Sequence, residues 1–230
     1  MSSHVPDMNI SQWREQWAGR VCTPEDLVSF VDAVGCCITG PLSGYPDFPN
    51  LDAVMGKVDP TVEEPWFWKD DLHIEKRLYY TRVFGGKPGF ISNKLLPVLM
   101  ATNGAVADEL LFNGQLSSDA QQIYQTIETH GTLATKELKR LLTLEAKKST
   151  DRLLISLDRK FLITKTDITG RRRGTYSYVW DLVERWVPEM LAAADRLGRE
   201  EATAMLIEYL TCFGIPPNSP FLRKVLGWMC

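Results

Sequence analysis

The chain has 230 residues, of which 44% are hydrophobic and 24% are charged, and this composition is typical of a globular protein with a substantial core. No stretch approaches the roughly 20 consecutive apolar residues of a membrane-spanning helix, and the first residues lack the charged-then-apolar layout of a signal peptide. We therefore expect a soluble, cytoplasmic protein with no membrane partner.

The cysteines and histidines predict neither a disulfide framework nor a metal site. The five cysteines are odd in number and contain no Cys-x-x-Cys pair, which is typical of buried thiols in a reducing compartment. The three histidines are scattered and have no second ligand at a matching spacing. We predict no metal and no other cofactor.

Charge is divided unevenly along the chain. Between positions 136 and 173 there are twelve Lys or Arg and five acidic residues, a net charge of +7. Because the whole chain carries −3, the remainder carries −10. This division suits a protein in which one face meets phosphates while the rest avoids indiscriminate association.

Residues 1–112 are predicted to form an N-terminal α+β, winged-helix-like subdomain. Trp13 and Trp17 lie four positions apart, and their shared helical face favours a short helix packed on the body. The first firm helix follows, with Thr23 as its N-cap and Gly35 at its end.

An irregular connection, a hairpin and a helix complete this predicted subdomain. Five prolines interrupt residues 39–65, so we expect at most a short helix near 51–55. Residues 78–92 predict a β-hairpin around a glycine-rich turn, and a helix capped by Ser92 or Asn93 follows.

Residues 118–180 predict a winged helix-turn-helix module. Hydrophobic residues at helical spacing mark three helices, the first ending at Gly131 and the second capped by Thr135. Strand-forming residues at 161–165 and 175–180 then flank an arginine-rich turn. Three helices followed by a basic-tipped hairpin is the winged-helix order.

The third helix and the turn carry the candidate contacts to double-stranded DNA. In this architecture the third helix enters the major groove, and its N-terminal turn faces bases and phosphates. Three arginines between two glycines contribute nothing obvious to folding, whereas arginines on a wing reach phosphates or a narrow minor groove. The alternatives are an ordinary solvated helix face or a protein-docking surface. The candidates are Lys147, Lys148, Ser149, Thr150, Arg152, Arg171, Arg172 and Arg173.

Two acidic residues of the third helix do not predict a catalytic pair. Seven positions separate Asp151 from Asp158, about 10.5 Å along the helix axis, which is too far to share a proton. We expect them to pair locally with Lys148, Arg152 or Arg159.

A second cluster combines acidic and aromatic residues and is predicted to lie in a loop. Aromatic side chains at this density stack on an unpaired base or plug a groove between subdomains, and we favour the plug. Loop acids are usually solvated, so these acids are catalytic candidates only if the protein is an enzyme. The acids are Glu63, Glu64, Asp70 and Asp71, and the base-stacking candidates are Trp66 and Trp68.

Residues 181–230 predict a C-terminal helical subdomain. We expect one helix from 182 to about 197, a second over 199–213 and a final one after the prolines at 216–220. The chain as a whole is expected to be mainly α with small β-hairpins, an α+β protein.

Several motifs along the chain resemble those of a known family. They are TPEDL at 23–27, PNLDAVMG at 49–56, WFWKDDL at 66–72, KRLYY at 76–80, FIS at 90–92 and LGW at 226–228. On these motifs the chain resembles the AlkZ-related proteins, shorter relatives of the tandem winged-helix DNA glycosylases that excise alkylated and crosslinked bases. The resemblance implies tandem winged helix-turn-helix subdomains that line a basic concave surface for duplex DNA.

The resemblance does not imply the enzyme activity. Catalytic members of the superfamily use Gln-x-Gln or Gln-x-Asp after their first long helix; the matching position here is Cys37-Ile38-Thr39, and neither motif occurs in the sequence. A thiol and a hydroxyl do not replace a carboxylate as general base without strong activation. We therefore predict a non-catalytic DNA-binding protein of repair or regulation. The alternatives are a DNA glycosylase that uses Glu63, Glu64, Asp70 or Asp71, and a protein-interaction adaptor.

Overall fold

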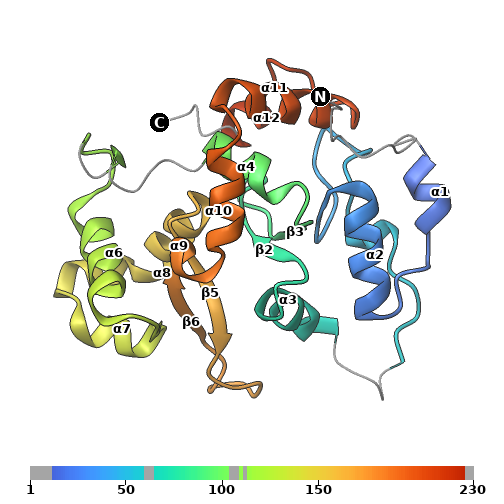
Figure 1. Cartoon of the computed structure of the whole chain (residues 1–230). Helices are drawn as coiled ribbons and strands as arrows, with labels where there is room; N and C mark the ends of the chain where they lie inside the picture. The colour runs from blue at the N-terminus through green and yellow to red at the C-terminus, as the bar shows by residue number, and fades with distance from the viewer. Residues whose placement is uncertain (1–11, 60–64, 104–108, 111–112, 226–230) are drawn as a thin grey trace. The chain divides into compact units, whose positions relative to one another are not determined.

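The computed structural model describes residues 12–59, 65–103, 109–110 and 113–225. The chain forms two units, one of residues 1–102 with 193–230 and the other of residues 103–192. Both contain helices and one small antiparallel sheet, so the chain is α+β as predicted (Figure 1). The three-part division made from the sequence stays a prediction. Within the described residues, no helix has the length and apolar character needed to cross a membrane.

Helix α2 (Pro24–Val34) begins and ends where the sequence predicts. The Thr23 hydroxyl accepts a hydrogen bond from the Asp26 amide (3.1 Å), and the Asp26 carboxylate accepts one from the Thr23 amide (3.0 Å). The Cys22 amide also donates to this carboxylate and is the main reason that the pKa of Asp26 lies below its usual value. At the other end Gly35 has a φ of 85°, a conformation that favours glycine.

Helix α1 (Trp13–Trp17) packs on α2, which confirms the prediction from its two tryptophans. The rings of Trp13 and Trp17 lie 5.8 and 5.4 Å from the ring of Phe30. Trp13 is buried, and its indole N–H donates to the carbonyl of Asp47 (3.0 Å). The buried indole therefore keeps a hydrogen-bond partner.

The first unit contains a three-stranded antiparallel sheet in the order β1-β3-β2. Strands β2 (Tyr79–Thr81) and β3 (Gly89–Ile91) form the predicted hairpin. The third strand, β1 (Cys36–Ile38), directly follows α2 and pairs with β3. Sequence reasoning missed β1 because three consecutive buried residues show no alternation.

The first unit also contains an aromatic core and further helices. Phe48 contacts the rings of Phe84, Phe213 and Phe221 at 5.4, 5.7 and 5.9 Å. The short helix expected near 51–55 is present as a 3-10 turn. The elements are η2 (Leu51–Ala53), α3 (Pro65–Ile74), α4 (Leu96–Asn103), α11 (Arg199–Thr211) and α12 (Pro220–Val225).

The second unit has its three helices and hairpin in the predicted order. A further strand, β4, precedes the second helix, and the antiparallel sheet has the order β4-β6-β5. Sequence reasoning missed β4 because two residues carry no periodic signal. The elements are α6 (Ser118–His130), β4 (Leu133–Ala134), α7 (Thr135–Leu141), α8 (Leu144–Arg159), β5 (Ile163–Ile168) and β6 (Tyr178–Leu182).

The prediction that Thr135 caps the second helix is wrong. The N-cap of α7 is Ala134, whose amide donates to the carboxylate of Glu137 (3.1 Å). Because β4 pairs with β6, Thr135 lies beside the sheet. Its hydroxyl donates to the carbonyl of Tyr178 and accepts from the indole of Trp180, each at 2.9 Å.

The predicted helix from 182 to 197 is two helices instead. Leu182 is the last residue of β6, and α9 (Val183–Trp186) and α10 (Pro188–Asp195) follow it. Pro188 lacks an amide hydrogen, so it begins a helix more readily than it continues one. The final helix, α12, is described as far as Val225.

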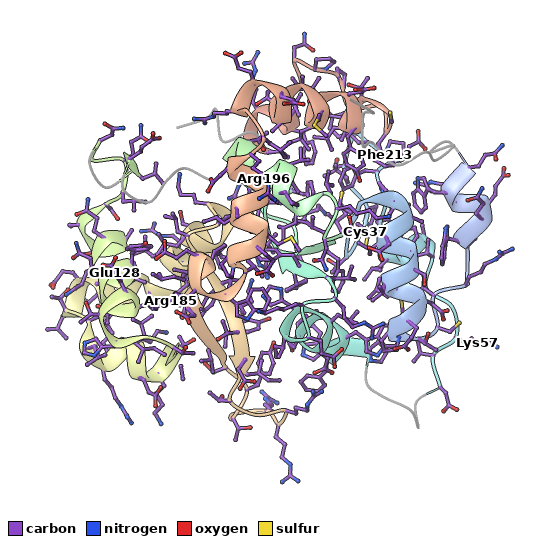
Figure 2. The ribbon with its side chains drawn as sticks, in the orientation of Figure 1. Cys37, Lys57, Glu128, Arg185, Arg196 and Phe213 are labelled. Atoms are coloured by element: carbon purple, nitrogen blue, oxygen red, sulfur yellow. The ribbon has the colours of Figure 1, made fainter. Side chains whose placement is uncertain are left out.

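Arg185 of α9 closes the C-terminal end of α6. Its guanidinium donates to the carbonyls of Ile127 (2.9 Å) and Glu128 (3.1 Å), and its Nε donates to Asp181 (2.8 Å). Figure 2 shows Arg185 beside Glu128. These bonds add a cation to the last turn of α6, where the Ile127 carbonyl also accepts from the Gly131 amide (2.9 Å).

We expect Leu154→Ala to lower the free energy of unfolding by about 2 to 5 kcal/mol, because it opens a cavity beneath α8. Leu154 is 2% exposed, whereas its neighbour Ile155 is 39% exposed. Ile155→Ala is therefore the matched control, with an expected change within about 0.5 kcal/mol. Urea unfolding measures both, and equal losses would contradict this assignment of the buried face.

Candidate nucleic-acid interface

The candidate residues of α8 do not all face solvent. Lys147, Lys148 and Arg152 are exposed. Ser149 is half-buried, and its hydroxyl donates to a carbonyl one turn earlier (3.1 Å). Thr150 is fully buried, and its hydroxyl also donates one turn back (2.9 Å). We therefore do not include Thr150 in the candidate interface.

The start of α8 lies earlier than the candidate residues. Thr143 is its N-cap and accepts from the Ala146 amide (3.4 Å), while the Thr143 hydroxyl donates to Gln122 of α6 (2.9 Å). Leu144 is the first helical residue. The exposed cations consequently lie from the end of the first turn to the third turn, not in the first turn alone.

The turn between β5 and β6 exposes all three arginines. Arg171, Arg172 and Arg173 are exposed at the tip of this hairpin, which projects from the helices of its own unit (Figure 1). The backbone of the turn is held in place, because the Thr175 amide and hydroxyl both donate to the Arg172 carbonyl at 3.0 Å. Gly174 completes the turn at a φ of 88°.

A buried ion pair joins α8 to the hairpin. Asp158 near the end of α8 contacts Lys165 of β5, with 2.8 Å between the carboxylate oxygen and Nζ and side chains only 2% and 9% exposed. The ammonium also lies 5.7 Å from the ring centre of Tyr178 and 5.6 Å from that of Trp180. The carboxylate and the ring faces together compensate a cation withdrawn from water.

The prediction of local ion pairs for the acids of α8 is wrong. Asp158 pairs with Lys165, and Asp151 pairs with Lys139 of α7 at 2.7 Å. Asp158 is buried beside Leu157 near the end of α8. The helical spacing of Asp158 could have predicted a partner on another element, because a buried carboxylate requires a partner from a packed neighbouring element.

The aromatic cluster lies on helix α3 and not in a loop. Trp68 is 3% exposed and packs in the core, whereas Trp66 is 63% exposed. The ammonium of Lys69 lies 4.2 Å from the ring centre of Trp66 and 2.7 Å from the carboxylate of Asp70. The two base-stacking candidates therefore differ, and only Trp66 presents its ring to solvent.

Two of the four acidic candidates, Asp70 and Asp71, lie on the same helix α3. Asp70 is 2% exposed and ion-paired with Lys69, while Asp71 is half-buried. Glu63 and Glu64 lie outside the described residues. In the part of the chain that the structure describes, no three His, Cys, Asp or Glu side chains gather closely enough to hold a metal ion.

Of the three residues that the family resemblance places at the catalytic motif, Cys37 and Ile38 are buried and Thr39 is half-buried. Cys37 lies in the middle of β1 with no exposed surface (Figure 2). Burial raises the pKa of Cys36 to about 12 and raises that of Cys37 well above its ordinary value. Neither thiol therefore supplies a thiolate nucleophile or base near neutral pH.

Fold and site define an α+β protein whose second unit displays a basic helix beside a basic hairpin. The protein-family model "AlkZ related" matches residues 21–227. The chain belongs to the AlkZ-related family, as its motifs indicate. In the two other comparisons, no curated protein and no solved structure matches the chain.

We expect Lys165→Met to lower the free energy of unfolding by about 3 to 5 kcal/mol, because it removes the ammonium that faces the buried Asp158 carboxylate. A double variant with Asp158→Leu should regain most of this loss. Lys139→Met, at a far more exposed pair, is the control and should cost less than about 1 kcal/mol. A double variant no more stable than Lys165→Met would contradict the pairing.

Proposed function

We propose that this chain is a non-catalytic winged-helix protein that binds double-stranded DNA in repair or regulation. The observation that carries the proposal is the buried ion pair between Asp158 and Lys165, which holds a basic helix and a basic hairpin in one fixed relation. Two basic elements that are fixed together can form one binding surface. Cations scattered over a surface do not form one. The proposal keeps the cytoplasmic location expected from the sequence.

The element order supports a winged helix-turn-helix over residues 118–180. Helix α6, strand β4, helices α7 and α8 and the β5–β6 hairpin follow one another, and β6 lies between β4 and β5. In this assignment α8 is the recognition helix and the hairpin is the wing. The tandem arrangement implied by the family is also part of the proposal, supported by the second three-stranded sheet, in the first unit.

The distribution of charge supports duplex DNA as the partner. Positions 136–173 carry +7 in a chain of net −3. The major groove, about 12 Å wide, admits one helix, and arginines on a wing reach the adjoining phosphates. The proposed contacts are Lys147, Lys148, Ser149, Arg152, Arg171, Arg172 and Arg173.

A DNA glycosylase is the second candidate function, favoured by membership of the AlkZ-related family. Its acid would come from Asp70 or Asp71, and Trp66 would stack on a displaced base. The ion pair between Asp70 and Lys69 counts against Asp70, because the carboxylate is already buried against a cation. We therefore keep catalysis as the alternative.

We expect neutralisation of the wing to flatten the salt dependence of duplex binding. Changing Arg171, Arg172 and Arg173 to Gln removes up to three phosphate contacts, each worth roughly 0.9 in the slope of log affinity against log salt. The loss of affinity should be similar for unrelated sequences. Titration of labelled duplexes at several salt concentrations measures the slope.

The control for this experiment changes the same number of charges in the first unit. Lys57, Arg196 and Arg199 are exposed, and changing them to Gln alters the net charge equally. This control should retain a steeper slope than the wing variant. An unchanged slope in the wing variant would remove the wing from the interface.

We expect the purified protein to bind a duplex with methylated purines and to release no free base above the protein-free control. Excision requires a positioned water and stabilisation of a developing oxocarbenium charge, and the buried Cys37 supplies neither. Chromatography of the released bases measures the activity. If the natural chain released free base and Asp71→Asn released less, the protein would be a glycosylase with its active site on α3.

A further inference from the structure

The solvent-facing line of α8 is not purely basic. Leu144 is 71% exposed and Ile155 is 39% exposed, and both are among the large hydrophobic residues that remain in water. Eleven positions separate them, which on an α-helix is three turns plus only about 20°. The two apolar side chains therefore lie on one line along the exposed face of α8.

Charged residues lie along and beside this line. Lys148, one turn after Leu144, is exposed, and so is Arg152 one turn further. Asp151 also lies close to the line, and its pair with Lys139 offsets the repulsion that a lone carboxylate would exert on phosphates. The exposed face thus combines two apolar side chains with neighbouring cations.

This combination does not fit contact with phosphates alone. Apolar side chains gain nothing from a phosphate row, whereas the major groove offers one apolar group, the C5 methyl of thymine. The axial distance between Leu144 and Ile155 is about 16.5 Å, from a rise of 1.5 Å per residue.

We propose that Leu144 and Ile155 read thymine methyl groups at two separate positions in the major groove. Lys148 and Arg152 hold the helix against the adjoining phosphates and guanine edges. This inference rests on the proposed DNA binding. It makes the chain selective for thymine-containing duplexes, which binding through phosphates alone would not achieve.

The test compares duplexes that differ only in the methyl group. One duplex is rich in A·T pairs, and the other carries deoxyuridine in place of every thymidine, so that base pairing and charge stay the same. Removing two buried methyl groups, at about 0.8 kcal/mol each, should weaken binding by the natural chain on the order of tenfold. The variant with Leu144→Ala and Ile155→Ala should bind both duplexes equally.

Leu141 supplies the matched control, since it is 47% exposed but lies on α7. Leu141→Ala should retain the preference for thymine. Because all three side chains are exposed, unfolding curves should stay close to that of the natural chain.

The possible failures are distinguishable. Equal, measurable affinity of the natural chain for both duplexes would overturn methyl readout, leave DNA binding intact and point to a protein partner for these side chains. A thymine preference that survives in the double variant would also overturn the inference, because other residues would then read the methyl groups. No binding to either duplex would overturn the proposed function, and this inference with it.

Discussion

The second unit depends on one buried pair of opposite charges. Asp158 and Lys165 lie on different elements, and each is almost entirely withdrawn from water. Separating α8 from β5 would break this buried pair, which is far more costly than losing a surface contact. The relation between the helix and the hairpin is therefore fixed by electrostatics as well as by hydrophobic packing.

The same pairing decides which charges remain on the surface. Lys165 pairs with Asp158 and Lys139 pairs with Asp151, so two of the three acids of α8 are held by lysines from outside the helix. Exposed cations remain along α8 and on the tip of the hairpin, where the backbone of the turn is independently hydrogen-bonded. Part of the net charge of +7 of positions 136–173 is therefore exposed on α8 and on the tip of the hairpin.

Features that depend on nearby residues were predictable from the sequence, and features that depend on distant partners were not. Thr23 and Gly35 delimit α2 as predicted, because capping involves residues within one turn. Strands β1 and β4 are defined only by the strands they pair with. The burial of Thr150 was within reach of sequence reasoning, because it continues the helical spacing of Ala146 and Leu154. The partner of Asp158 was not, because it lies on another element.

The segment after α2 is where the family resemblance places the catalytic motif of the glycosylases. The hydroxyl of Tyr209 donates to the carbonyl of Val34, and a Cβ on Gly35 would lie 2.7 Å from that hydroxyl. The next residues enter a sheet in which Cys37 is fully buried. Polar groups that hold an attacking water require access to solvent and to a displaced base. Of the residues that the resemblance places at this position, Cys37 and Ile38 lie in a packed strand, and Thr39 follows the strand half-buried.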